Sequence, residues 1–239
     1  MDTVESETIL LQPNPFAAPA PCAVQWKRSA RARRVSIKID PREAAVVVTL
    51  PPRVARRTGM SLLQQHAGWV LQRLAALAPA QRLEPGASLP IGDIPHEIVH
   101  APDRRGGVAI EDGRLVVTGG IEFLPRRIQD FLRSEAARRI RLRTPVHAEA
   151  LGVRPRAVRV KDTSSRWGSC APDGTLAFSW RLVMAPDWVL DYVVAHEVAH
   201  LRELNHSPRF WAHVERLTPH RRAAETWLKR QGPALLRVG

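Results

Sequence analysis

The sequence has little cysteine and no long apolar run. Its 239 residues include two cysteines, Cys22 and Cys170, which are too few for a disulfide framework or for a zinc site built only from thiolates. No uninterrupted apolar segment approaches the roughly 18 residues of a membrane-spanning helix. Residues 1–5 are acidic overall and lack the basic and then apolar order of a secretory signal peptide. We therefore expect a soluble, cytoplasmic protein with no membrane partner.

Acidic residues are scarce relative to basic ones. There are 36 Lys and Arg against 23 Asp and Glu, and the formal net charge is +13. Such a surplus favours polyanions, so a nucleotide or a nucleic acid is a candidate partner through the Arg-rich surface. The high content of Ala, Arg and Pro fits a general compositional bias equally well. The charge alone therefore bears on association and does not assign a reaction.

The residues that are present predict a folded chain with a β-rich first half. Hydrophobic residues make up 44% and charged residues 25%, as in ordinary globular proteins. Residues 1–22 are rich in proline and are predicted to form a disordered tail. Alternating apolar residues predict a β-hairpin over 33–50, and helical spacing predicts one helix over 58–77. With further short strands over 85–118, we predict a β-rich N-terminal region over residues 23–120.

In the second half of the sequence, the residue patterns predict longer helices and a small sheet. The predicted fold class is therefore α+β. Helical spacing, hydroxyl caps and prolines in first turns indicate four helices, and short apolar runs indicate two strands. The predicted helices cover about 124–151 and 186–204 and begin again at 207 and 218, and the strands cover 157–161 and 176–180. Arginines line the outer face of the first helix, which can bridge the two halves or face a polyanion.

One motif on the helix over 186–204 carries the chemistry, His196-Glu197-Val198-Ala199-His200. Residues four apart lie about 40° apart on a helix, so His196 and His200 can meet one tetrahedral zinc ion. Glu197 is suited to act as the general base on a zinc-activated water. The apolar run before the motif predicts a buried helix, where unpaired histidines would be costly. We therefore predict Zn2+ as the cofactor of a hydrolase.

A catalytic zinc ion usually has three protein ligands, and three residues are candidates for the third. His206 is favoured because Asn205 tolerates the left-handed conformation of a helix end, which can turn His206 back to the metal. Glu203 lies within about 20° of His196 on a helical wheel. Glu215 follows on the next helix. Cys170 is interpreted as a small buried residue.

The residues around this motif resemble the YgjP-like metal-dependent hydrolases. The resemblance rests on two segments, residues 166–170 and 191–211, and extends over about 24–228. It implies a zincin-like metallohydrolase region over 121–239, with a small sheet packed on the HExxH helix. It also implies His196, His200 and His206 as zinc ligands and Glu197 as the base. The family is distantly similar to SprT-like proteases, some of which act on DNA-bound protein.

Three functions remain open at this stage. The leading hypothesis is a metallopeptidase that hydrolyses a peptide or protein substrate, by analogy with zincins. A zinc-dependent nucleotide or phosphoanhydride hydrolase would use the arginine surplus at the same site. A DNA-associated binding protein or protease would use the basic surface. Ser169 and Tyr192 are candidates for oxyanion stabilisation, with packing as the simpler interpretation, and the oligomeric state is not predicted.

Overall fold

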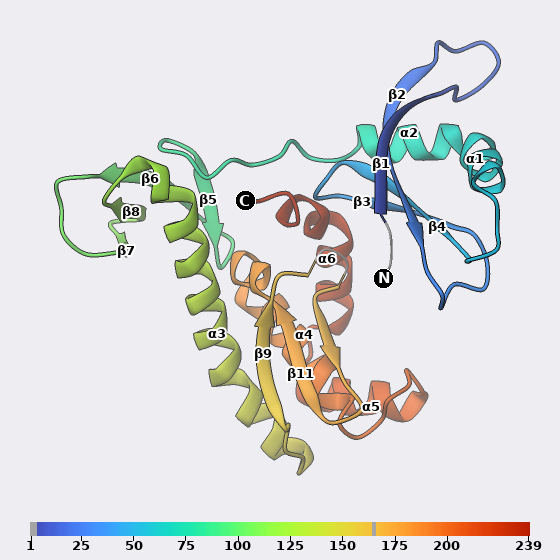
Figure 1. The fold of residues 1–239 in the computed structure, drawn as a ribbon. Coiled ribbons are helices and arrows are strands. Elements are labelled where there is room, and N and C mark those ends of the chain that lie inside the picture. The colour runs from blue at the N-terminus through green and yellow to red at the C-terminus, as the bar shows by residue number, and fades with distance from the viewer. Residues whose placement is uncertain (1–3, 164–165) are drawn as a thin grey trace. The chain divides into compact units, whose positions relative to one another are not determined.

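The computed structural model describes residues 4–163 and 166–239, and the chain divides into two compact units, Met1–Pro79 and Ala80–Gly239. Within the described residues it contains three small sheets and six α-helices, which confirms the predicted α+β class (Figure 1). No helix in this described part is long and apolar enough to cross a membrane. Each unit has a hydrophobic core of its own.

The first unit is a four-stranded sheet covered by two helices. Its elements are β1 (Val4–Leu11), β2 (Ala20–Arg28), β3 (Ser36–Asp40), β4 (Ala45–Leu50), α1 (Arg56–Gln65) and α2 (Ala67–Ala75). The strand order is β1-β2-β4-β3, and the predicted hairpin over 33–50 is confirmed as the antiparallel pair β3–β4. Apolar residues of the strands, such as Val24 and Val48, pack against Leu63 and Val70 of the helices.

The prediction of a disordered tail over 1–22 is wrong for residues 4–22. β1 pairs antiparallel with β2 from Val4 opposite Lys27 to Leu11 opposite Ala20. Residues 4–11 contain no proline, and the prolines that suggested a tail lie mainly in the connection between the two strands. β1 is an edge strand that is exposed along most of its length, so it carries no alternating apolar pattern. Residues 1–3 lie outside the described residues.

The helix predicted over 58–77 is divided in two at His66. This residue has φ −105° and ψ 14°, outside the helical region, so α1 ends before it and α2 starts after it. Both helices still pack on the same core, through Leu63 and Val70. The helix is interrupted by the backbone conformation of one residue, His66. The spacing of hydrophobic residues does not reveal such a local change.

The second unit begins with another four-stranded sheet. Because of this sheet, the boundary between the two units lies earlier in the chain than predicted. The strands β5 (Ser88–Ile91), β6 (Ile94–Ala101), β7 (Val108–Glu111) and β8 (Arg114–Thr118) are ordered β5-β6-β8-β7. Residues Leu89, Ile98 and Leu115 of this sheet belong to the same core as the C-terminal helices. The predicted boundary near residue 120 therefore differs from the division at 79 and 80, because this sheet packs with the helices that come after it in the chain.

The remaining elements build the region around the HExxH motif. They are η1 (Ile121–Phe123), α3 (Leu124–Leu151), β9 (Ala157–Lys161), β10 (Gly168–Cys170), β11 (Thr175–Ser179), η2 (Trp180–Met184), α4 (Asp187–Ala199), α5 (Pro208–Leu217) and α6 (Arg221–Leu235). The strands form a three-stranded sheet in the order β10-β11-β9. The bounds predicted for the helix over 124–151 and the strand over 157–161 are confirmed.

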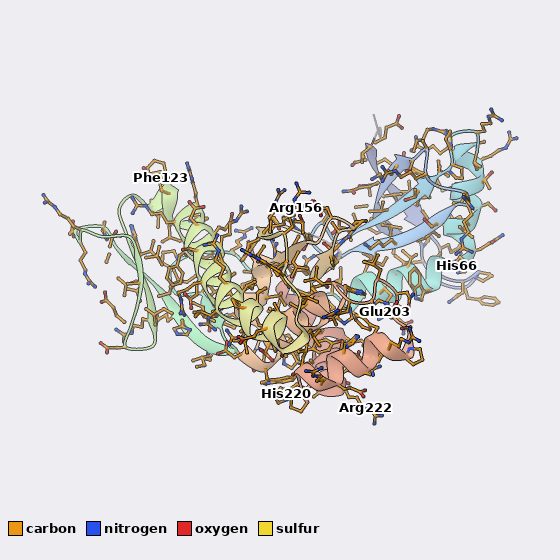
Figure 2. The ribbon with its side chains drawn as sticks, turned by 90° about the horizontal axis from the view of Figure 1, so that it is seen from below. His66, Phe123, Arg156, Glu203, His220 and Arg222 are labelled. Carbon is orange, nitrogen blue, oxygen red and sulfur yellow. The ribbon has the colours of Figure 1, made fainter. Side chains whose placement is uncertain are left out.

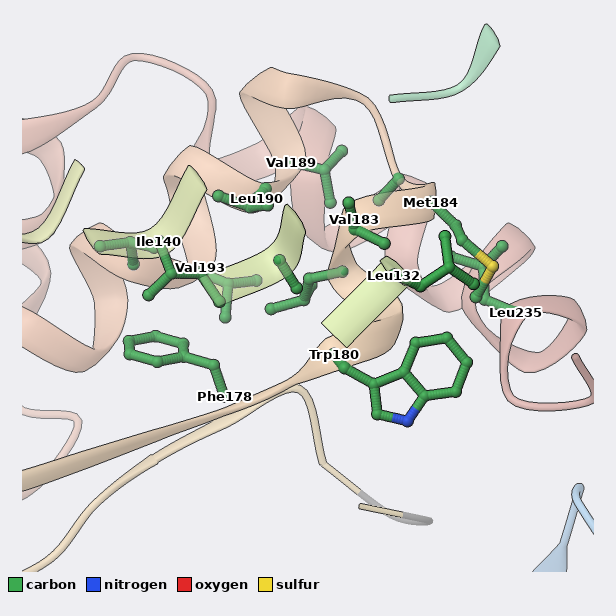
Figure 3. Packing of buried hydrophobic residues seen from close by; sticks show 14 of the residues in the cluster. Leu132, Ile140, Phe178, Trp180, Val183, Met184, Val189, Leu190, Val193 and Leu235 are labelled. Carbon is green, nitrogen blue, oxygen red and sulfur yellow. The ribbon is translucent and has the colours of Figure 1, made fainter. Parts of the chain in front are cut away.

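α3 and α4 pack together because each has a long apolar surface. α3 buries Leu124, Ile128, Leu132, Ala136 and Ile140, which recur every four residues along one face. α4 buries apolar residues on all sides. Side chains from α3, β11, η2, α4 and α6 meet in one core (Figure 3). This packing makes α4 a rigid support for the histidines at its end.

Candidate metal centre

α4 ends at Ala199, five residues earlier than predicted, and the chain then turns back toward the helix. The turn is closed by side chains: Oδ1 of Asn205 accepts a hydrogen bond of 3.0 Å from the N–H of Ser207. Oγ of Ser207 in turn caps α5 by accepting from the N–H of Phe210. Asn205 is not among the left-handed residues of the described chain, so the expected backbone mechanism is replaced by a side-chain turn.

The turn brings three imidazoles together. The candidate ligand atoms of His196, His200 and His206 all lie within 4.8 Å of one another. Nε2 of His206 is 3.2 Å from Nε2 of His196. Two nitrogens bound tetrahedrally to one zinc ion at about 2.0–2.1 Å would be about 3.3–3.4 Å apart. The spacing of these two imidazoles therefore fits a zinc ion between them.

Hydrogen bonds to the other ring nitrogen orient two of the histidines. Nδ1 of His200 lies 3.0 Å from the main-chain oxygen of Glu203, to which it donates when protonated. The hydroxyl of Tyr192 donates to Oε1 of Glu225 at 2.9 Å and lies 3.4 Å from Nδ1 of His196. A histidine held through Nδ1 presents the lone pair of Nε2 to a metal ion.

The surroundings of His196 and His200 favour the neutral form of both imidazoles, which is the form that binds a metal ion. Burial, and then the neighbouring imidazoles of His200 and His206, lower the pKa of His196 to about 3. Burial also lowers the pKa of His200. Both rings are therefore unprotonated at neutral pH and available as ligands.

Glu197 is buried beside the histidines against strand β10. Its exposed fraction is 6%, and burial raises its pKa to about 7, with Arg166 opposing the rise. Gly168 of β10 makes room for it, because a methyl group at Gly168 would lie only 2.7 Å from Cδ of Glu197. The glycine at this position therefore provides space for the carboxyl group.

Aromatic rings from α5 cover two of the histidines. Phe210 stacks on His200 with ring centroids 4.4 Å apart, and Trp211 stacks on His206 at 5.4 Å. The guanidinium group of Arg221 lies over the Trp211 ring at 3.5 Å and pairs with Glu215 and Glu225 of α5 and α6. α5 and α6 therefore support the histidines from outside α4.

The rival third ligands lie outside this group. The helical-wheel argument for Glu203, which is labelled in Figure 2, fails because α4 ends before this residue. The main-chain oxygen of Glu203 contacts His200 instead. Glu215 accepts a hydrogen bond of 2.8 Å from Arg221. Cys170 is half-buried in β10, and burial raises the pKa of its thiol. None of these three belongs to the cluster of candidate ligands in the described part of the chain.

Arg221 and Glu225 were not identified from the sequence as part of the site. They lie on α6, and Glu225 is 33 residues from Tyr192 in the chain. Neither falls in a motif or at a helical spacing from the histidines, so only the packing of α6 on α4 brings them there. Phe210 and Trp211 had a signal, since they belong to the segment that carries the family resemblance.

Three converging histidines beside a buried glutamate are typical of a metal-dependent hydrolase. The profile of the YgjP-like, metallopeptidase domain family matches residues 33–231, and the chain belongs to this family. No curated protein matches the chain. Among solved structures, the metallopeptidase zymogen of Pyrococcus abyssi abylysin matches with 23% identity and a TM-score of 0.35, covering 39% of this chain and 92% of that chain. So distant a likeness carries no argument about the site.

Proposed function

We propose that this protein is a zinc metallopeptidase with a zincin-like catalytic region, in which a small sheet packs on the HExxH helix. His196, His200 and His206 hold the Zn2+ ion, and Glu197 is the general base. The observation that carries the proposal is the convergence of the candidate ligand atoms of three histidines within 4.8 Å of one another, beside Glu197, which is 6% exposed. Membership of a metallopeptidase family makes a peptide bond the expected target.

The residues of this chain supply a base and an orienting frame. When bound, zinc supplies a Lewis acid that polarises a carbonyl group and acidifies water. Glu197 takes the proton of the attacking water and returns it to the nitrogen of the leaving amine. Burial raises the pKa of Glu197 to about 7 without the metal ion, and the charge of a bound zinc ion would oppose this rise and favour the carboxylate that accepts the proton. Tyr192 and the Glu203 carbonyl orient His196 and His200 during this exchange.

The position of β10 supports a substrate in extended conformation. β10 is at one edge of the three-stranded sheet, and its Gly168 touches Glu197. An extended peptide that paired with this edge would have its backbone beside the carboxyl group of the base. This arrangement favours a polypeptide over a compact small molecule as the substrate.

The ligand set is tested by metal content. Mass spectrometry of the wild-type protein should find about one zinc ion per chain, as expected for one catalytic site. His206→Ala should retain much less, because it leaves two ligands. His213→Ala is the matched control, since His213 is partly exposed on α5 and lies outside the cluster, and it should bind zinc like the wild type. Equal zinc in His206→Ala and the wild type would remove His206 from the ligand set.

The role of Glu197 is tested with Glu197→Gln, which keeps the shape of the side chain and removes the base. We expect proteolysis of casein to fall by at least about a hundredfold while zinc content is unchanged. Glu203→Gln serves as the control, because Glu203 contacts the site through its main chain, and it should stay active. Retained proteolysis in Glu197→Gln would refute the assignment of the base.

The arginine beside the histidines does not favour a phosphoanhydride substrate. Arg221, the arginine stacked beside the histidines, is paired with two glutamates and covers Trp211, so it is poorly placed to bind a phosphate group. Nucleoside triphosphates assayed alongside casein would separate the two reactions. Hydrolysis of the triphosphates without proteolysis, lost in Glu197→Gln, would replace the peptidase by a phosphoanhydride hydrolase on the same site.

A further inference from the structure

The edge of β9 is left open in the three-stranded sheet. β9 pairs in parallel with β11, from Ala157 opposite Thr175 to Lys161 opposite Ser179, and in the described chain no strand pairs with its other side. An open edge presents main-chain N–H and C=O groups that can pair with another strand. β9 and β10 are opposite edges of the sheet, so this opening is distinct from the edge beside Glu197.

A groove follows this open edge between β9 and α3, which lie side by side (Figure 1). A cavity of about 440 Å³ is lined by four consecutive residues of β9, 158–161, and by Ala137 and Arg141 of α3. Side chains of a strand alternate between its two faces, so consecutive residues line one cavity only along the edge of the strand. A second cavity of about 530 Å³ shares Arg141 and Val158 and continues the groove to Pro155.

The groove carries positively charged side chains that form no close ion pair with a carboxylate in the part of the chain that the structure describes. Arg141, Arg159 and Lys161 are exposed, and among the described residues no carboxylate pairs with them within 4.0 Å. Other arginines of α3 are paired: Arg133 with Asp162, and Arg139 with Glu135 and Asp187. Within the described chain, Arg141, Arg159 and Lys161 thus place three cations without an ion pair along the open edge of the sheet.

We propose that the β9 edge is a docking site for an extended acidic segment of a partner protein. The segment adds a strand to β9 through main-chain hydrogen bonds and places its carboxylates against Arg141, Arg159 and Lys161. The open main-chain edge selects a polypeptide over a nucleic acid, because a nucleic acid would engage only the charges. The site involves none of the proposed metal ligands, so docking does not depend on the zinc ion.

Binding of a labelled peptide of alternating Glu and Val to the full-length chain tests the charges, with fluorescence anisotropy as the readout. The variant Arg159→Glu/Lys161→Glu should bind at least about tenfold more weakly, since two attractive pairs become repulsive. Arg105→Glu/Arg230→Glu makes the same change of net charge at exposed residues outside the groove, and should bind within about threefold of the wild type. An equal loss in both variants, or no binding to the wild type, overturns the proposal.

The main-chain contacts are tested on the peptide, which leaves the protein intact. N-methylation of alternate residues along one edge of the peptide removes its donors and should weaken binding by at least about tenfold if the peptide forms a strand. A methylated peptide that binds as well as the parent, or an oligothymidylate of equal charge that binds more tightly, would make the groove a site for polyanions in general. The variant His196→Ala should bind the peptide like the wild type. The test of the docking site therefore does not depend on whether the proposed metal site is correct.

Discussion

At the scale of single residues, the histidines are held by partners that come from distant parts of the chain. Tyr192 is buried, with 5% exposed, and its hydroxyl connects His196 to the carboxylate of Glu225. Carboxylates commonly orient metal-binding histidines directly, and here a tyrosine stands between the two groups. The motif itself could be predicted from the sequence, because its spacing lies within one helix. The Glu225 contact could not, since it depends on how α6 packs.

Tyr192→Phe tests this connection by removing one hydroxyl group and little volume. We expect zinc affinity to fall by about tenfold, because His196 loses its orienting partner, while the fold is retained. Competition with a chromophoric chelator measures the change. Glu225→Gln should weaken binding less, and the double variant should be no weaker than Tyr192→Phe alone, since both act through one chain of contacts. Additive losses would mean that the two side chains act separately.

At the scale of elements, the strongly patterned segments were predicted and the weakly patterned ones were not. α3 shows apolar residues at every fourth position and a left-handed Gly152 at its C-terminal end, with φ 61°, so both its type and its end were readable. β1 is held by main-chain pairing and by polar contacts of Glu5 and Glu7, and Leu11 is its one buried residue, so the strand leaves no alternating apolar pattern in the sequence. The end of α4 was placed too late because Leu201 and Leu204 continue an apolar spacing beyond the last helical residue.

The contact between α3 and α4 includes a carboxylate whose titration should be visible in stability. Hydrogen bonds from Arg138, and then Arg139, lower the pKa of Glu135 to about 2 from an ordinary value of 4.5. Arg139 also bonds Asp187 at the start of α4. A lowered pKa stabilises the fold above about pH 4.5, and this contribution is lost as pH falls toward about 2.

Glu135→Gln should therefore lower the free energy of unfolding at pH 7 by about 1–2 kcal/mol, less than the full shift implies because Arg138 is solvated. The difference from wild type should shrink steadily between pH 4.5 and pH 2, as followed by urea denaturation. Asp130→Asn is the control on the same helix, because its pair with Arg126 is exposed and 3.8 Å long. A difference independent of pH would assign the loss to packing.

At the scale of the whole molecule, the proposed catalytic residues and their supports lie within the second unit. Among the described residues, the buried core of this unit runs from Leu83 to Val238, while the buried core of the first unit runs from Leu11 to Val70. The start of the second unit is tied to its own end, where the N–H of Gln81 donates to the carbonyl of Arg237 at 3.0 Å. The sequence patterns placed the boundary near 120, where the predicted strands end and the long helix begins. Such patterns do not show which hydrophobic core a strand or helix packs into.

The fragment Ala80–Gly239 should accordingly fold and bind zinc without the first unit. We expect about one zinc ion per fragment, and an unfolding midpoint that depends on zinc, because ligands that bind only the folded state stabilise it. The isolated fragment Met1–Pro79 provides the comparison and should bind none. A fragment Ala80–Gly239 that is unfolded by circular dichroism would mean that the two cores are not independent.

The burial of Glu197 creates a conflict between selection for activity and selection for a stable fold. A carboxyl group placed among apolar side chains of α4 and against β10 destabilises the fold whenever it is ionised. Replacing it by leucine would remove that penalty together with the base. A lineage that abandoned hydrolysis and kept the fold would therefore drift toward an apolar residue at this position and toward greater heat resistance, whereas retention of glutamate indicates that the chemistry is still being maintained.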